Sequence, residues 1–341
     1  MDIDANAGAP EASGASSGFL SSRLFAFVRV AATLAVLAGL VYKLKADLAG
    51  TIRDADPWLL LAALGLMTVV QGLVVVKWVV LMRVRDVRAR LDDVIRAYCV
   101  GNLLSNVLPT AVGGDVYRVY RIQRDANARA ADVTMSVLYE RATGYGAMTC
   151  FGALGAAFYF GSPAIGVVAL GIGAAAAVVL AVVLPRLPFP AVRHDHFLRN
   201  LLAHRRELMA VYQMFVFSLV IQALYISTIA IIGRAFGVHV SWWYWAFVTW
   251  VVAIAVLAPV TLGGLGIRES SFAGFVKHGG ATAAQGASTG FALGLLLIIV
   301  NASGLLAIEI AERLGYSGVA APIDDAAALR AAASDPVSAE H

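Results

Sequence analysis

Long apolar runs recur along most of the chain. A helix needs ~20 apolar residues to cross a bilayer. Five runs reach about this length without a charged residue, and two weaker ones are interrupted by Arg29 or Lys77. We therefore expect an all-α, polytopic integral membrane protein with about seven or eight membrane helices. The predicted spans are 24–44, 58–82, 142–160, 162–185, 208–233, 240–267 and 279–308.

The composition predicts the same fold class. Hydrophobic residues make up 60% of the chain and charged residues 14%, whereas a soluble domain carries roughly 25% charged residues. The net charge is +4, and its arginines lie in loops beside apolar runs, where anionic lipid is a better partner than nucleic acid. The two cysteines, Cys99 and Cys150, have no CxxC spacing, so we expect neither a metal site, nor a disulfide, nor another cofactor.

The distribution of basic residues predicts the orientation. Arginines gather at 83–96 and at 186–206, and the loops on the other side are short or less basic. Because cytoplasmic loops are enriched in Lys and Arg, we expect a multi-pass protein whose N-terminus lies in the cytoplasm. The Ala-rich polar tails 1–21 and 316–341 are predicted to be disordered, with one transmembrane domain at 22–315 between them.

The segment 95–110 breaks the alternation of spans and loops. It is moderately apolar and short, and a second arginine-rich stretch follows at 118–129. If both arginine-rich stretches lie in the cytoplasm, the segment between them must enter the membrane and return. Non-helical backbone at membrane depth is tolerated only where protein or a watery cavity covers it. We therefore expect two re-entrant or broken segments, one near 95–110 and one near 262–278, beside a cavity.

A repeated motif marks both of these segments. The sequences LPTAVGGDVYR at 108–118 and APVTLGGLGIR at 258–268 both fit P-x3-G-G-x3-R, at an offset of 150 residues. Proline ends a helix, paired glycines allow a sharp turn, and the amides of a restarting helix attract anions. The arginine one turn later suits phosphate. Interrupted segments at matching positions of two halves indicate a transporter site. Chance similarity and a purely structural pair of tight turns are the alternatives.

Several other polar residues fall within apolar surroundings. Intramembrane charges usually face a cavity and pair with one another, so we expect Glu140 or Glu269 to pair with a motif arginine. Arg141 and Lys77 can instead extend toward the membrane interface, which we favour for Lys77 over a role as a cavity cation. The candidate substrate-binding residues are Asn102, Pro109, Gly113, Gly114, Asp115, Arg118, Glu140, Arg141, Pro259, Gly263, Gly264, Arg268 and Glu269.

Three blocks carry a family resemblance. N-x6-P-x3-G-G-D-x2-R at 102–118, the Glu140–Arg141 pair and P-x3-G-G-L-G-x-R-E at 259–269 resemble the lysylphosphatidylglycerol synthase transmembrane (flippase-like) family over roughly residues 22–315. The resemblance implies a bacterial inner-membrane protein with re-entrant elements. Well-known members move an anionic phospholipid between leaflets, and relatives are associated with polyprenyl-phosphate sugar or hopanoid metabolism.

Two departures from the family pattern limit what the resemblance implies. Its aminoacylating members carry a large soluble C-terminal domain, whereas this chain ends about thirty residues after the last predicted span, so we do not expect aminoacyl transfer. Asp115 also stands where the family often has Glu, which keeps the carboxylate but shortens its reach.

Three functions remain open. The first is a flippase or transporter for an anionic phospholipid or polyprenyl-phosphate-linked lipid. The second is a non-catalytic accessory subunit that positions a partner enzyme in envelope-lipid synthesis. The third, a membrane enzyme acting on a lipid-linked substrate, is the least favoured, because Asp92–Asp93 is the only adjacent acidic pair within 22–315 and the histidines at 194, 196 and 204 lie in a predominantly basic loop.

Overall fold

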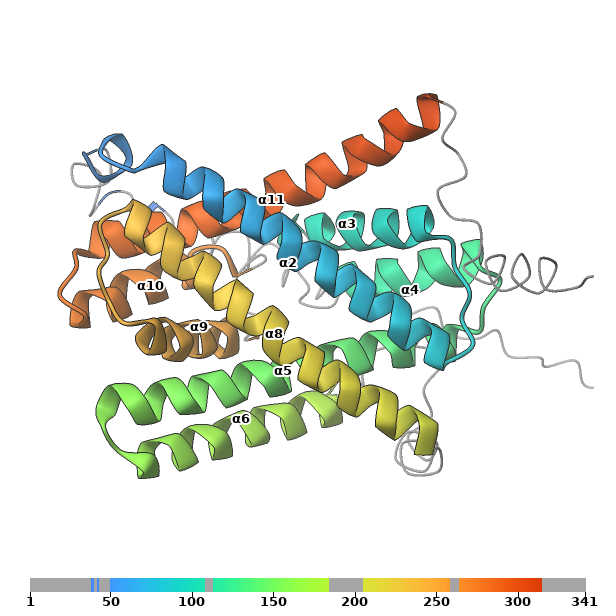
Figure 1. Ribbon diagram of the computed structural model, residues 1–341, viewed down its shortest axis with the longest axis horizontal. Coiled ribbons are helices and arrows are strands. Elements are labelled where there is room, and N and C mark those ends of the chain that lie inside the picture. Colours follow the sequence, from blue (N-terminus) through green and yellow to red (C-terminus); the bar gives the residue numbers. More distant parts are fainter. Residues whose placement is uncertain are drawn as a thin grey trace, which may run out of the picture.

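The described part of the chain is helical. The computed structural model describes residues 38–39, 42, 50–107, 113–183, 205–257 and 264–314, and these contain helices but no strand (Figure 1). This confirms the predicted all-α, polytopic membrane fold. Both predicted tails, and nearly all of the predicted span 24–44, lie outside these residues. The helices are α2 (Pro57–Val84), α3 (Leu91–Val107), α4 (Gly113–Asp125), α5 (Ala130–Phe160), α6 (Pro163–Val183), α8 (Arg205–Ala235), α9 (Trp242–Leu257), α10 (Ile267–His278) and α11 (Ala283–Arg313).

Among the described residues, three helices, α2, α8 and α11, are long and apolar enough to cross a membrane. Helix α2 begins where Asp56 accepts hydrogen bonds from the backbone N–H groups of Trp58 and Leu59, with Pro57 at the first helical position. These contacts satisfy amides that have no partner within the helix. Along α2, Leu61 and Val69 remain more than half exposed, so its outer face is apolar, as a lipid-facing surface requires.

Helix α5 is longer than the predicted span 142–160. It begins at Ala130 and runs for 31 residues to Phe160, so the Glu140–Arg141 pair lies within the helix and not at its start. Paired side chains allow this, because their charges are compensated by neighbouring helices. Gly161 ends the helix with a φ of 63°, the left-handed conformation that glycine adopts without strain.

The predicted full span 240–267 is wrong. Helix α9 ends at Leu257 after 16 residues, a rise of about 24 Å, which is shorter than the ~30 Å hydrocarbon core. Helix α10 then begins at Ile267 and packs back against α9. The second broken segment is therefore the helical hairpin α9–α10. The first is the hairpin α3–α4, which matches the predicted re-entrant segment near 95–110.

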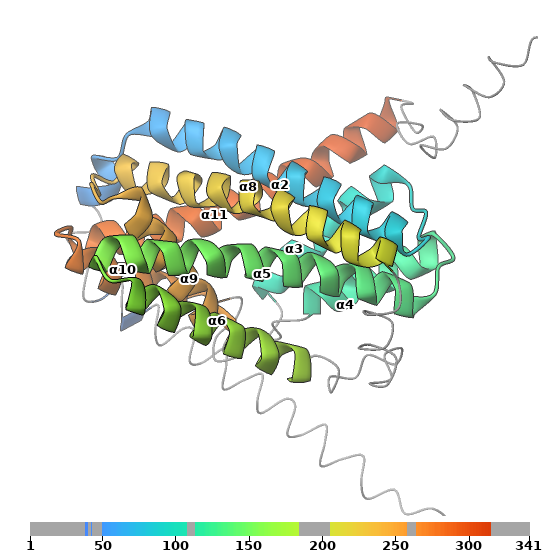
Figure 2. The ribbon, with the colours of Figure 1, turned by 60° about the horizontal axis from the view of Figure 1, so that its bottom comes forward.

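The two hairpins enter the bundle from opposite ends. In Figure 1, α3–α4 lies at the end where α2 finishes, and α9–α10 lies at the end where α11 starts. Figure 2 shows the same separation after a rotation of the view. This is the arrangement expected of two inverted structural repeats, and it agrees with the motif repeat in the sequence.

Candidate functional site

Arg118, from the first motif, is buried between three helices, with 1% of its surface exposed. Its Cζ lies 3.9 Å from the ring centroid of Trp78 and 4.9 Å from that of Tyr98. Nη2 lies 3.0 Å from Glu140 Oε2 in an ion pair, and Nη1 donates to Asp115 Oδ1 at 3.3 Å. The predicted pairing of Glu140 with a motif arginine is thus present, and it joins α4 to α5.

Asp115 connects a second arginine to this cluster. Arg141 donates to it twice, from Nε to Oδ2 at 3.1 Å and from Nη2 to Oδ1 at 2.8 Å. This is the bidentate geometry in which a guanidinium and a carboxylate interact most strongly. The shorter carboxylate at this position therefore reaches arginines on both α4 and α5.

Two glycines let α3 and α4 approach closely. A Cβ on Gly114 would collide with the backbone oxygen of Gly101 and with Ser105 Oγ, and a Cβ on Gly101 would lie 2.7 Å from Arg118 Cγ. Because these contacts involve backbone and a buried ion pair, neither position has room for a side chain. Gly114 of the first motif is therefore required for the close contact between α3 and α4.

The second motif forms its own ion pair. Arg268 donates from Nε and Nη2 to Glu269 Oε1 at 3.0 and 2.7 Å, and Glu269 also accepts the backbone N–H of Gly266. The anion at the amino end of α10 is therefore the chain's own carboxylate. Gly264 has a φ of 73°, and Gly294 on α11 leaves the space that the Arg268 guanidinium occupies.

Lys77 lies in the middle of α2 and is 2% exposed, so the interpretation that it extends to the membrane interface is wrong. Its Nζ donates to the backbone oxygen of Glu140 at 3.0 Å and to Ser218 Oγ at 3.1 Å. Among the described residues, no carboxylate oxygen lies within 4.0 Å of this ammonium. Lys77 is therefore a buried cation held by neutral acceptors.

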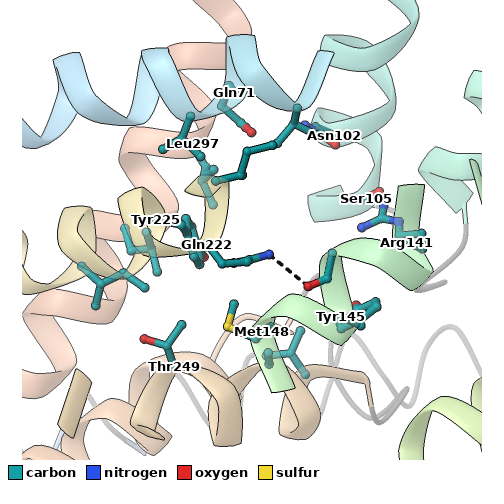
Figure 3. A pocket seen from close by; sticks show the side chains of 18 of the residues that line it. Gln71, Asn102, Ser105, Arg141, Tyr145, Met148, Gln222, Tyr225, Thr249 and Leu297 are labelled. Carbon is teal, nitrogen blue, oxygen red and sulfur yellow. Dashed lines mark hydrogen bonds between the residues drawn. The ribbon is translucent and has the colours of Figure 1, made fainter. Parts of the chain in front are cut away.

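A cavity of about 380 Å³ lies between these groups (Figure 3). It is bounded by side chains of α2, α3, α5, α8, α9, α10 and α11. Lys77, Arg141 and Arg268 supply cations to its wall, and Glu140 supplies a carboxylate. The remaining polar lining is neutral and comprises Gln71, Tyr98, Asn102, Ser105, Tyr145, Gln222, Tyr225, Thr249 and Asn301.

The predicted site residues divide into two layers. Asn102, Glu140, Arg141 and Arg268 line the cavity. A layer behind them comprises Asp115, Arg118 and Glu269, which hold the lining by ion pairs, and the glycines Gly113, Gly114 and Gly264 at the hairpin breaks. Pro109, Pro259 and Gly263 lie outside the described residues.

Sequence reasoning missed several lining residues. Lys77 had a signal as a charge within an apolar run, but the interface interpretation was favoured over the cavity. Gln222, Tyr145 and Tyr225 had almost none, since single polar residues on apolar helices are common. Only the fold brings α5 and α8 together, where Gln222 Nε2 donates to the Gly144 oxygen at 3.3 Å (dashed line in Figure 3).

Comparison with known proteins identifies one similarity. A protein-family model described as the lysylphosphatidylglycerol synthase TM region matches residues 28–304. This range contains both hairpins and every residue that lines the cavity. Searches of curated proteins and of solved structures gave no match.

Proposed function

This chain belongs to the lysylphosphatidylglycerol synthase transmembrane family, and we propose that it binds the head group of an anionic lipid and transfers the lipid between membrane leaflets. The lipid is a phospholipid or a polyprenyl-phosphate-linked lipid. The proposed process is binding and movement, without covalent chemistry.

The excess of positive charge around the cavity carries this proposal. Four cations, Lys77, Arg118, Arg141 and Arg268, face three carboxylates, and only Lys77 has no carboxylate in contact among the described residues. The charge of Glu140 acts on Lys77 as well as on Arg118, with which it pairs, so the cluster keeps an excess of one positive charge. An uncompensated charge is unfavourable in a membrane protein. A lipid phosphate in the cavity would compensate it.

The size and position of the cavity also favour a head group. A volume of about 380 Å³ lies within the usual range of ligand pockets, roughly 300–1,000 Å³, so it suits a head group while the acyl chains stay in the bilayer. The two hairpins both contribute to its wall and come from opposite ends. Movement of one hairpin at a time would open the cavity to one leaflet at a time.

We infer the cellular setting from the sequence. The family resemblance favours the bacterial inner membrane, and the arginine-rich loops favour a cytoplasmic N-terminus. A partner enzyme of envelope-lipid synthesis would be consistent with a head-group site, and it would be found by co-purification. Transfer by the purified chain alone distinguishes the flippase from a subunit that acts only with a partner.

The test is transfer of fluorescent phosphatidylglycerol in proteoliposomes, measured by quenching of the outer leaflet. We expect Lys77→Met to reduce the transfer rate by about tenfold or more, because the phosphate loses a buried cation worth at least 1.4 kcal/mol. Lys277→Met is the matched control, since Lys277 is exposed on α10. Methionine fills a similar volume, so the fold should persist. Wild-type transfer by a folded Lys77→Met protein would contradict the proposal.

A further inference from the structure

We propose that the cavity selects an anionic head group whose part beyond the phosphate is a neutral polyol, and that it disfavours head groups bearing an ammonium. This inference rests on the proposed function and specifies its substrate class. Glycerol and sugar phosphates share the required chemistry, which is one negative charge with adjoining hydroxyl groups.

Unpaired neutral groups on the cavity wall lead to this inference. Tyr145 and Tyr225 line this cavity and are partly exposed. Among the described residues, Gln222 Oε1 and Thr249 Oγ1 are buried without a hydrogen-bond partner, and Thr249 is 3% exposed. Buried polar atoms are normally hydrogen-bonded, because leaving one unpaired costs about 1–3 kcal/mol. These atoms therefore need a ligand or water to complete them.

The chemistry of these atoms fits hydroxyl groups. The Gln222 amide nitrogen already donates to the Gly144 oxygen, which leaves Oε1 as an acceptor, while the tyrosine and threonine hydroxyls both donate and accept. A polyol offers several groups that do both. An aromatic ring such as that of Tyr225 also provides a surface for the apolar face of a sugar or glycerol.

Arg141 and the neutral residues Tyr225 and Thr249 lie on different sides of the cavity, and the charge of Arg268 acts on Tyr225. In Figure 3, Arg141 and Ser105 lie on one side, Tyr225 and Thr249 lie on the opposite side, and Gln222 lies between them. A phosphate near Arg141 would thus direct its polar substituent toward Gln222, Tyr225 and Thr249. The separation matches a head group with a charged part followed by an uncharged part.

An ammonium has no suitable partner in this cavity. Glu140 supplies the only carboxylate of the described lining, and it is already paired with Arg118 at 3.0 Å, beside Lys77. Asp115 and Glu269 lie behind the wall, each held by arginine. An incoming ammonium would therefore meet like charges. A lysine ester of phosphatidylglycerol brings two of them, so it fits this cavity worse than phosphatidylglycerol itself.

Equilibrium binding of defined lipids to the purified full chain, measured by native mass spectrometry, tests the inference. The probes share their acyl chains and are phosphatidylglycerol, phosphatidylinositol, phosphatidic acid, phosphatidylethanolamine, lysylphosphatidylglycerol and phosphatidylcholine. We expect at least one polyol lipid, phosphatidylglycerol or phosphatidylinositol, to bind about tenfold tighter than each ammonium lipid. The same polyol lipid should bind about three- to tenfold tighter than phosphatidic acid, because its hydroxyl groups add one or two hydrogen bonds to the cavity lining.

Two variants test whether the neutral residues Thr249 and Tyr225 of the cavity lining cause the preference for polyol lipids. Thr249→Val and Tyr225→Phe should each lower the affinity for the preferred polyol lipid toward that for phosphatidic acid, and leave phosphatidic acid binding unchanged. Thr68→Val and Tyr212→Phe are matched controls, because both residues are exposed on the outer surfaces of α2 and α8. They should preserve the preference.

The outcomes separate this inference from the proposed function. The inference alone would be overturned if polyol lipids bound no tighter than phosphatidic acid, or if ammonium lipids bound as tightly as polyol lipids. An unchanged preference in both variants would also overturn it. Binding of every anionic lipid no tighter than phosphatidylcholine would overturn the proposed function as well.

Discussion

The guanidinium carbon of Arg118 lies 3.9 Å from the ring centroid of Trp78. The indole is itself fixed, because its Nε1 donates to Ser136 Oγ at 3.1 Å. A desolvated cation over an indole gains about 2 kcal/mol. Helix α2 therefore holds the arginine of the first motif through an aromatic ring, and α5 holds it through both Ser136 and Glu140.

We expect Arg118→Ala to destabilise the protein by about 3–5 kcal/mol, because it leaves Glu140 buried without its arginine. Denaturant titration of the purified protein in detergent measures this change. The double variant Arg118→Met with Glu140→Gln removes both charges and should recover more than half of the lost stability. Equal stability of Arg118→Ala and the wild type would show that this ion pair does not hold the hairpin.

Gly114→Ala should prevent the close packing of α3 and α4. The added Cβ would overlap the Gly101 oxygen and Ser105 Oγ, and such overpacking typically costs about 1–3 kcal/mol or more. Gly72→Ala on α2 is the matched control, since nothing lies within 4 Å of the place that its Cβ would occupy. The control should be neutral or slightly stabilising. A shared thermal midpoint for the two variants would refute the packing argument.

An ionic contact at one end of the bundle joins three helices. Arg85, just after α2, contacts Asp132 on α5 and Glu207 on α8, each at 2.7 Å. All three side chains are largely buried, so Arg85→Gln should lower stability by about 1–3 kcal/mol. Arg313→Gln, which breaks an exposed pair with Glu309, should change it by less than about 0.5 kcal/mol. Thermal unfolding of both variants checks the difference.

The predicted orientation can be tested by cysteine labelling in whole cells. Asn127 lies in the turn between α4 and α5, and His239 lies between α8 and α9, at the other end of the bundle; both are exposed. In a background with Cys99→Ser and Cys150→Ser, a membrane-impermeant maleimide should label His239→Cys in intact cells. It should label Asn127→Cys only after the membrane is permeabilised. The reverse pattern would invert the proposed topology.

The sequence predicted the helical class, the hairpin α3–α4 and the pairing of Glu140 or Glu269 with a motif arginine from hydropathy, charge placement and a motif. It failed at 240–267, because α9 is apolar and no charged residue occurs between it and Arg268. Hydropathy reports burial in lipid or protein alike, and it does not detect a change of direction. The cavity position of Lys77 was considered but not favoured for a related reason, since its partners Glu140 and Ser218 lie 63 and 141 residues away.

Each motif arginine shares its space with a glycine on another helix. Gly101 on α3 faces Arg118, and Gly294 on α11 faces Arg268. In a closely packed interior, volume lost on one side must be filled from the other. Related chains that replace either arginine with a smaller residue should therefore enlarge the facing glycine. In an alignment, such correlated substitutions would show which of the two arginines a given relative has lost.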